Sequence, residues 1–218
     1  MKDPDVTQGL RNCWLIALLI PLVMGRAETV YQNDFTTVPL GEEPADFLVL
    51  DGAFTVVKDG PNRVLELPGA PLDNFGALFG PSIREGNQIQ VSVFSRSKGR
   101  LAPAFGVGVN GLGGFRALVS GNKRTLEILR GDEPLASVGF RWKGDVWVHL
   151  LLQAAPQSDG RWRVRAKVWE GDADPPEGWL VVLEHQDAPP RGKPSIWGHP
   201  FSGQPIRYDH LKVDLLTP

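Results

Sequence analysis

Four residues near the middle of the chain carry groups suited to binding a polysaccharide: Trp147, His149, Arg163 and Arg165. A tryptophan ring stacks on the apolar face of a sugar ring, and the planar fork of an arginine binds hydroxyls, carboxylates or sulfates. Each pair is spaced by two residues, so its members point to the same side of an extended segment. If the two segments pair, we expect one contiguous patch that binds an anionic polysaccharide.

Two long strands of a β-hairpin must position this patch. Residues 161–168 read RWRVRAKV, and this alternation of cationic and apolar residues indicates a strand with one buried face, on which Trp162 belongs to the core. Residues 146–153 alternate more weakly, and Ala154–Gly160 supplies turn formers. The expected register pairs Leu152 with Trp162 and Leu150 with Val164, which sets Trp147 opposite Lys167 and His149 opposite Arg165. The alternative is a solvated outer face, with Trp147 covered by the stem of Lys167.

The rest of the chain predicts further short strands and almost no helix, a pattern typical of an all-β sandwich. Its 25 glycines and 19 prolines suit tight turns between such strands. Trp142 and Trp197 are expected in loops. Gly106-x-Gly108-x-x-Gly111 has the letters of a dinucleotide-binding motif but leads into another strand, which excludes that function. The predicted strands are Val30–Phe35, Ala53–Val57, Asn62–Leu67, Ala77–Phe79, Gln88–Ser95, Ala104–Val109, Phe115–Val119, Thr125–Leu129, Leu135–Phe140, Leu180–His185 and Ile206–Leu215.

Four segments together carry a resemblance to a known family: DVWVHL at 145–150, RVRAKVW at 163–169, PPEGW at 175–179 and YDHLKV at 208–213. They resemble the concanavalin A-like lectin/glucanase superfamily, in particular the laminin-G-like jelly-roll domains of secreted bacterial proteins. The resemblance implies a jelly roll of two antiparallel sheets over most of residues 30–216. It also implies that the four-residue patch lies where these lectins and glucanases carry their concave groove. It does not imply an activity, because the superfamily includes lectins, glycosidases and lyases.

The resemblance further implies a structural calcium ion where the first and last strands meet. Asp34 and Asp209 are the candidate ligands, because carboxylate oxygens suit Ca²⁺. Each aspartate has a simpler interpretation as well, Asp34 as a turn former and Asp209 as an outward polar residue of the last strand. The four histidines are too far apart in the sequence to indicate a zinc site.

The first 27 residues are predicted to be a signal peptide cut after Ala27. The apolar run Cys13–Met24 is too short to span a bilayer; Lys2 and Arg11 precede it, and Gly25-Arg26-Ala27 follows it. An uncleaved anchor is the alternative. The remaining residues 28–218 contain no cysteine and form one predicted domain, which we expect to be secreted or periplasmic, with no membrane span. The net charge of −2 argues against nucleic acid as a partner.

The sequence therefore predicts a non-catalytic module that binds carbohydrate or another component of the cell envelope. A glycan-active hydrolase or lyase of the same fold is the first alternative. The glucanase signature of alternating carboxylates does not occur, and the chain has only two tyrosines, Tyr31 and Tyr208, which disfavours a lyase. A structural envelope protein without a small ligand is the second alternative.

Overall fold

The protein is described by a computed structural model that places residues 27–69, 74–97, 101–200 and 203–216. The predicted signal peptide lies outside the described residues except for Ala27, the first residue of β1. Within the described part of the chain, no helix has the length and apolar character needed to cross a membrane. The described strands are β1 (Ala27–Asn33), β2 (Leu48–Asp51), β3 (Thr55–Asp59), β4 (Asn62–Leu67), β5 (Phe75–Leu78), β6 (Asn87–Phe94), β7 (Ala104–Val109), β8 (Phe115–Ser120), β9 (Thr125–Arg130), β10 (Glu133–Gly139), β11 (Val148–Pro156), β12 (Trp162–Glu170), β13 (Val181–His185), β14 (Ser195–His199) and β15 (Ile206–Leu216).

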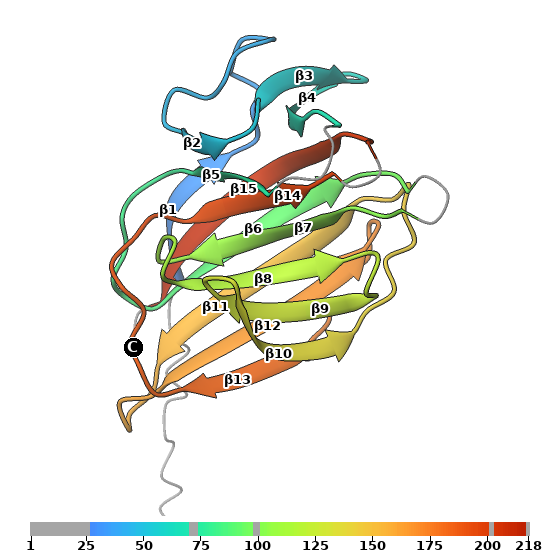
Figure 1. The fold of residues 1–218 in the computed structure, drawn as a ribbon. Helices are drawn as coiled ribbons and strands as arrows, with labels where there is room; N and C mark the ends of the chain where they lie inside the picture. Colours follow the sequence, from blue (N-terminus) through green and yellow to red (C-terminus); the bar gives the residue numbers. More distant parts are fainter. Residues whose placement is uncertain (1–26, 70–73, 98–100, 201–202, 217–218) are drawn as a thin grey trace, which may run out of the picture.

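The strands form two antiparallel sheets that lie face to face (Figure 1). The eight-stranded sheet has the order β13-β12-β11-β6-β15-β4-β3, with β1 paired to β15. The seven-stranded sheet has the order β10-β9-β8-β7-β14-β5-β2. The first and last strands are therefore neighbours in one sheet, and each sheet is built from segments distant in sequence.

The core lies between the sheets, where the strands bury their inward side chains. On β11 and β12 the inward residues, such as Leu150 and Val164, are fully buried. Trp162 is buried as predicted. Tyr208 of β15 is fully buried and donates its hydroxyl to the carbonyl oxygen of Trp197 in the other sheet, at 2.9 Å. This bond satisfies a buried hydroxyl and links the two sheets.

The predicted register of the central hairpin is wrong by four residues. Leu152 pairs with Ala166 rather than Trp162, and His149 pairs with Trp169 rather than Arg165. The strands continue as far as Pro156 and Trp162, and the tight turn is closed by Gly160 at a φ of 83°. The sequence interpretation ended β11 too early because Ala154 to Pro156 resemble turn formers. Because the error is an even number of residues, the inward and outward sides were assigned correctly.

Two strands were not predicted, and one of them contains Trp197. Most predicted strands are confirmed within a few residues, including the hairpin of β3 and β4. β2 and β14 are additional. Trp197, expected in a loop, lies in the middle of β14, between β5 and β7.

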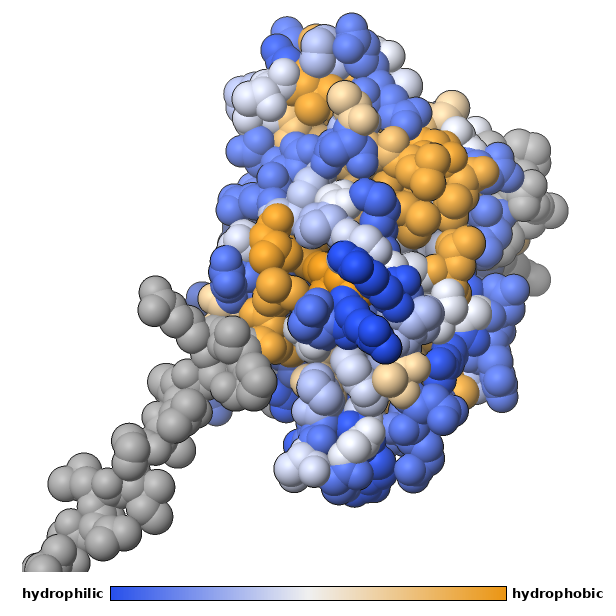
Figure 2. Space-filling model, turned by 90° about the vertical axis from the view of Figure 1, so that its left-hand side faces the viewer, coloured by the Kyte–Doolittle hydropathy of each residue, from blue (hydrophilic) through white to orange (hydrophobic). Residues whose placement is uncertain are grey.

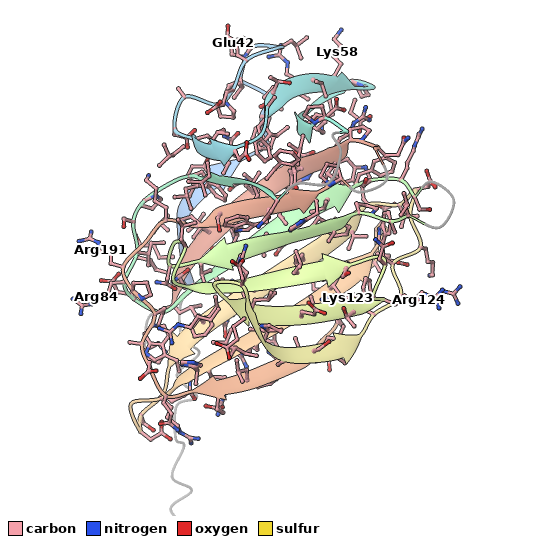
Figure 3. The ribbon with its side chains drawn as sticks, viewed as in Figure 1. Glu42, Lys58, Arg84, Lys123, Arg124 and Arg191 are labelled. Atoms are coloured by element: carbon pink, nitrogen blue, oxygen red, sulfur yellow. The ribbon has the colours of Figure 1, made fainter. Side chains whose placement is uncertain are left out.

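Cationic side chains are spread over opposite edges of the sandwich. Lys123 and Arg124 lie in the turn between β8 and β9, and Arg84 and Arg191 project from the other edge (Figure 3). On the side where Arg84 and Arg191 project, hydrophilic residues lie between separate groups of hydrophobic ones (Figure 2). These charges therefore do not form one patch.

Candidate functional site

The two arginines of the predicted patch lie on the outer face of the eight-stranded sheet, where protein groups contact both. Arg163 forms an ion pair with Glu184 of β13 at 2.6 Å. Arg165 donates from Nε to Gln153 at 2.7 Å, and its guanidinium lies 4.3 Å from the ring centroid of Trp179. Burial, together with the nearby charge of Arg163, lowers the pKa of Arg165. The segment that follows β12 thus folds back over this part of the sheet.

His149 lies on the same face but is held by its neighbours. Its Nε2 atom is 2.9 Å from the carbonyl oxygen of Gly171, and its Nδ1 atom is 2.9 Å from the hydroxyl of Ser92. A carbonyl oxygen only accepts hydrogen bonds, so Nε2 carries a proton. The ring stacks on Trp169 with centroids 5.3 Å apart. Arg165 pairs with Gln153 of β11, which lies four residues after His149. Arg165 and His149 are therefore separated by about 13 Å along the strand.

Trp147 precedes β11 and belongs to a different group of side chains. Its ring packs against Phe94 of β6, with centroids 5.5 Å apart. Lys167, which was expected to cover Trp147, instead lies 5.2 Å from the ring of Trp179. The structure therefore separates Trp147 from the two arginines, and the predicted patch is not one contiguous surface.

The predicted calcium ligands come close enough to influence one another. The carboxylate of Asp34 accepts the hydroxyl and the backbone N–H of Thr36, and these bonds lower the pKa of Asp34. Burial, with a smaller contribution from the charge of Asp34, raises the pKa of Asp209, which accepts hydrogen bonds from Asn62 and the N–H of His210. Across residues 27–69, 74–97, 101–200 and 203–216, no three His, Cys, Asp or Glu side chains gather as a metal site.

The outer face of the seven-stranded sheet holds a group of side chains that the sequence interpretation missed. Trp197 of β14 lies beside Gly76 of β5 and Gly106 of β7 in the cross-strand register. Neither glycine has a side chain, and a Cβ atom on Gly76 would lie only 2.8 Å from the indole. The indole therefore has room to lie along the sheet. Its Nε1 donates to the hydroxyl of Ser195 at 2.9 Å.

Arg116 of β8 covers this indole. The guanidinium lies 4.3 Å from the ring centroid of Trp197, within the range of a cation–π contact. Its Nη2 atom donates to the carboxylate of Asp132 at 2.8 Å and to the carbonyl oxygen of Gly131. The Arg116 side chain is only 12% exposed. None of the described residues hydrogen-bonds its Nε–H, which is buried.

A hollow of about 100 Å³ lies beside this arginine, and we call it the Arg116 hollow. It is lined by Asn74, Arg116, Leu118, Leu129, Asp132 and His199. Two leucines supply apolar surface, and an amide, an imidazole, a guanidinium and a carboxylate surround them. Because the lining arginine and aspartate are ion-paired, the hollow has little net charge.

Glu127, a further carboxylate on this face, is engaged elsewhere. Glu127 of β9 is buried and bound by Lys123 at 3.2 Å and by the Thr125 hydroxyl at 3.0 Å. Among the described residues that line the Arg116 hollow, Asp132 is the single carboxylate. The hydrolases of glycosidic bonds use two, about 5 to 9.5 Å apart.

The comparison with solved structures defines the class of fold as a lectin-like jelly roll, as predicted from the sequence. The exoplasmic/lumenal domain of VIP36 in its Ca²⁺/Man-bound form matches with a TM-score of 0.58 and 10% identity, over 88% of this chain and 92% of that one. The CBM2 module of the evolved Dit of Lactobacillus casei BL23 phage J-1 matches with a TM-score of 0.56 and 9% identity, over 89% of this chain and 98% of that one. A legume lectin-like domain from Entamoeba histolytica matches with a TM-score of 0.54 and 9% identity, over 77% of this chain and 89% of that one. No protein-family model matches the chain, and no curated protein matches it.

Proposed function

We propose that the protein binds carbohydrate, with a neutral sugar in the Arg116 hollow. The observation that carries the proposal is a hollow in which the Arg116 guanidinium, an amide and an imidazole lie with two leucines. Sugar hydroxyls bind to polar groups of this kind, and the two leucines suit the apolar face of a sugar ring. The occurrence of the fold in lectin domains and carbohydrate-binding modules supports the same class of ligand.

The ion pair that lines the hollow favours a neutral sugar over a charged one. Asp132 balances Arg116 at 2.8 Å, so an anionic ligand would meet a carboxylate at the same place. Asn74 and His199 also line the hollow, and their side chains carry hydrogen-bonding groups. We expect selectivity to come from hydroxyl geometry rather than from charge.

An array of immobilised neutral oligosaccharides tests the proposal. Wild-type protein should bind at least one class, and Arg116→Gln and Asn74→Ala should each weaken that binding roughly tenfold or more. Arg163→Gln is the matched control, because it removes an arginine from the opposite sheet. Unchanged binding by both site variants, each with an intact melting transition, would place the ligand elsewhere. The absence of binding by wild type would favour the structural alternative.

We also propose that binding occurs without cleavage. The support is the single carboxylate among the described lining residues, where a glycosidase needs a pair. Incubation of the bound oligosaccharides with the protein should release no reducing ends. A release that Asp132→Asn abolishes would make the protein a hydrolase.

We propose that the protein works outside the cytoplasm, as a module of the cell envelope or a secreted protein. The support is the apolar run Cys13–Met24 and the absence of cysteine from the predicted mature domain. A cut after Ala27 would remove one residue of β1 and one cross-strand pair, Ala27 with Leu216. Amino-terminal sequencing of exported protein should begin at Glu28.

A further inference from the structure

A second hollow lies on the opposite side of the sandwich, on the outer face of the eight-stranded sheet. It encloses about 90 Å³ and is lined by Phe94, Arg96, Gln204, Pro205 and Arg207. We call it the Arg96–Arg207 hollow. These described lining residues include two arginines and no carboxylate, in contrast to the Arg116 hollow.

The carboxylates that hold the two arginines are not part of the lining. Arg207 donates from Nε to Glu66 at 2.9 Å and from Nη1 to Asp59 at 3.0 Å. Glu66 lies next to Arg207 in the register, on β4, while Phe94 lies on the other side, on β6. The acidic partners therefore fix Arg207 from one side, and its guanidinium also borders the hollow.

Arg96 borders the hollow from the end of β6. Its Nε atom pairs with Asp145 at 3.2 Å, and both side chains are largely exposed. An exposed ion pair of this kind contributes little and exchanges readily for another anion. The guanidinium lies over the ring of Phe94, 5.9 Å from its centroid, and both residues line the hollow.

An aromatic surface continues from the hollow. Phe94 packs against Trp147 with centroids 5.5 Å apart, and both rings are partly exposed on the outer face. Aromatic faces beside a pair of guanidinium forks suit a sugar ring that carries a carboxylate or a sulfate. A free inorganic anion would use the arginines but not the rings.

We propose that the Arg96–Arg207 hollow binds the acidic group of a polysaccharide, a uronate carboxylate or a sulfate ester, with the neighbouring sugar on Phe94 and Trp147. This site is separate from the Arg116 hollow and does not depend on it. The two sites lie on opposite outer faces, so one molecule can hold two glycan chains, one acidic and one neutral.

Titration calorimetry of the purified protein with a uronate oligosaccharide, its sulfated counterpart, a neutral analogue of equal length and inorganic sulfate tests the proposal. Arg96→Gln is the main variant, because Arg96 is exposed and its loss should not unfold the protein. It should weaken binding of the acidic oligosaccharide roughly tenfold or more and leave binding of the neutral one unchanged. Arg96→Lys keeps the charge without the fork and should give an intermediate affinity. Arg163→Gln, on the same face, should have no effect.

The outcomes separate this proposal from the first one. Arg116→Gln should weaken binding of the neutral ligand only, and Arg96→Gln should weaken binding of the acidic ligand only. If the uronate binds and the sulfated sugar does not, the acidic group is a carboxylate, and the reverse identifies a sulfate ester. Inorganic sulfate that binds as tightly as the oligosaccharides would overturn the role of the aromatic rings. Failure of wild type to bind either acidic oligosaccharide, or equal binding by wild type and Arg96→Gln, would overturn the proposal.

Discussion

The guanidinium of Arg116 lies 4.3 Å from the ring centroid of Trp197, and the guanidinium of Arg165 lies at the same distance from Trp179 on the other sheet. The two contacts differ in their surroundings. Lys167 lies over the same ring as Arg165 and donates to the carbonyl oxygen of Pro176, so the segment after β12 covers that pair. Arg116 instead borders a hollow. The same kind of arginine–tryptophan contact thus stabilises a loop on the eight-stranded sheet and lines a candidate site on the seven-stranded sheet.

Replacement of Arg116 by lysine should destabilise the protein and weaken glycan binding together. Lysine keeps the positive charge but cannot stack its plane on Trp197 or reach Gly131 and Asp132 with one rigid fork. We expect the free energy of unfolding to fall by roughly 1 to 3 kcal/mol, from lost charge-assisted hydrogen bonds and the cation–π contact. Urea denaturation followed by tryptophan fluorescence measures the change. A lysine variant as stable as wild type, with unchanged affinity, would contradict the role given to the guanidinium.

Gly76→Ala should displace Trp197. The added Cβ would lie 2.8 Å from Cε3 of the indole, and such overpacking typically costs about 1 to 3 kcal/mol. Gly139→Ala on β10 is the matched control, because its Cβ meets no atom within 4 Å and its backbone needs no glycine. The control should be neutral or slightly stabilising, since alanine loses less backbone entropy than glycine on folding. Melting temperatures and near-ultraviolet circular dichroism distinguish the two. Equal effects of both changes would show that the indole does not need the space.

The inward and outward sides of the central hairpin were predictable because they depend on a local pattern of period two. RWRVRAKV identifies the buried side of β12 without knowledge of its partner. The register was not predictable in the same way, because it depends on where the turn begins. Pro156 is typical of turns but is the last residue of β11, so the predicted register differs from the observed one by four residues.

The Arg116 hollow could not be predicted because its parts come together through non-local pairing. Trp197 meets Gly76 and Gly106, each about ninety residues or more away in the sequence, only because β14 lies between β5 and β7. The signal available in the sequence was weak, since SIWGH is short and contains a glycine. Gly106 and Gly108 were the better indication of close approach, because an added Cβ would clash with the carbonyl oxygen of Ala117 at the first and with the hydroxyl of Ser195 at the second.

Calcium should not change the stability of the protein. The resemblance to lectins led us to expect a calcium ion at Asp34 and Asp209. Calcium takes six to eight oxygen ligands, and these two carboxylates already accept hydrogen bonds from Thr36, Asn62 and His210. Thermal melting in millimolar CaCl₂ and in excess EDTA should therefore coincide, because a ligand raises stability only if it binds the folded state. A higher melting temperature with calcium that Asp209→Asn abolishes would restore the calcium site.

Asp214 should govern part of the loss of stability in acid. Its side chain, 5% exposed, accepts hydrogen bonds from Thr29 at 2.6 Å and Gln88 at 3.0 Å and pairs with Lys212 at 3.2 Å. Burial alone would raise the pKa of Asp214, but these partners outweigh it and hold the pKa below its usual value. A carboxylate with a lowered pKa stabilises the folded state above the pKa it has when unfolded, about 4, and this contribution is lost as the pH falls through the folded value.

Asp214→Asn should therefore cost roughly 1 to 3 kcal/mol at neutral pH, and this difference from wild type should shrink as the pH falls below about 4. Thr29→Val tests the cause, because it removes one donor to the carboxylate and leaves Asp214 in place. It should raise the pKa of Asp214 toward its usual value and move the acid loss of stability to higher pH. Urea midpoints measured from pH 2.5 to pH 7 for the three proteins decide the matter. A difference between wild type and Asp214→Asn that stays constant over this range would mean that the charge of Asp214 contributes nothing to folding.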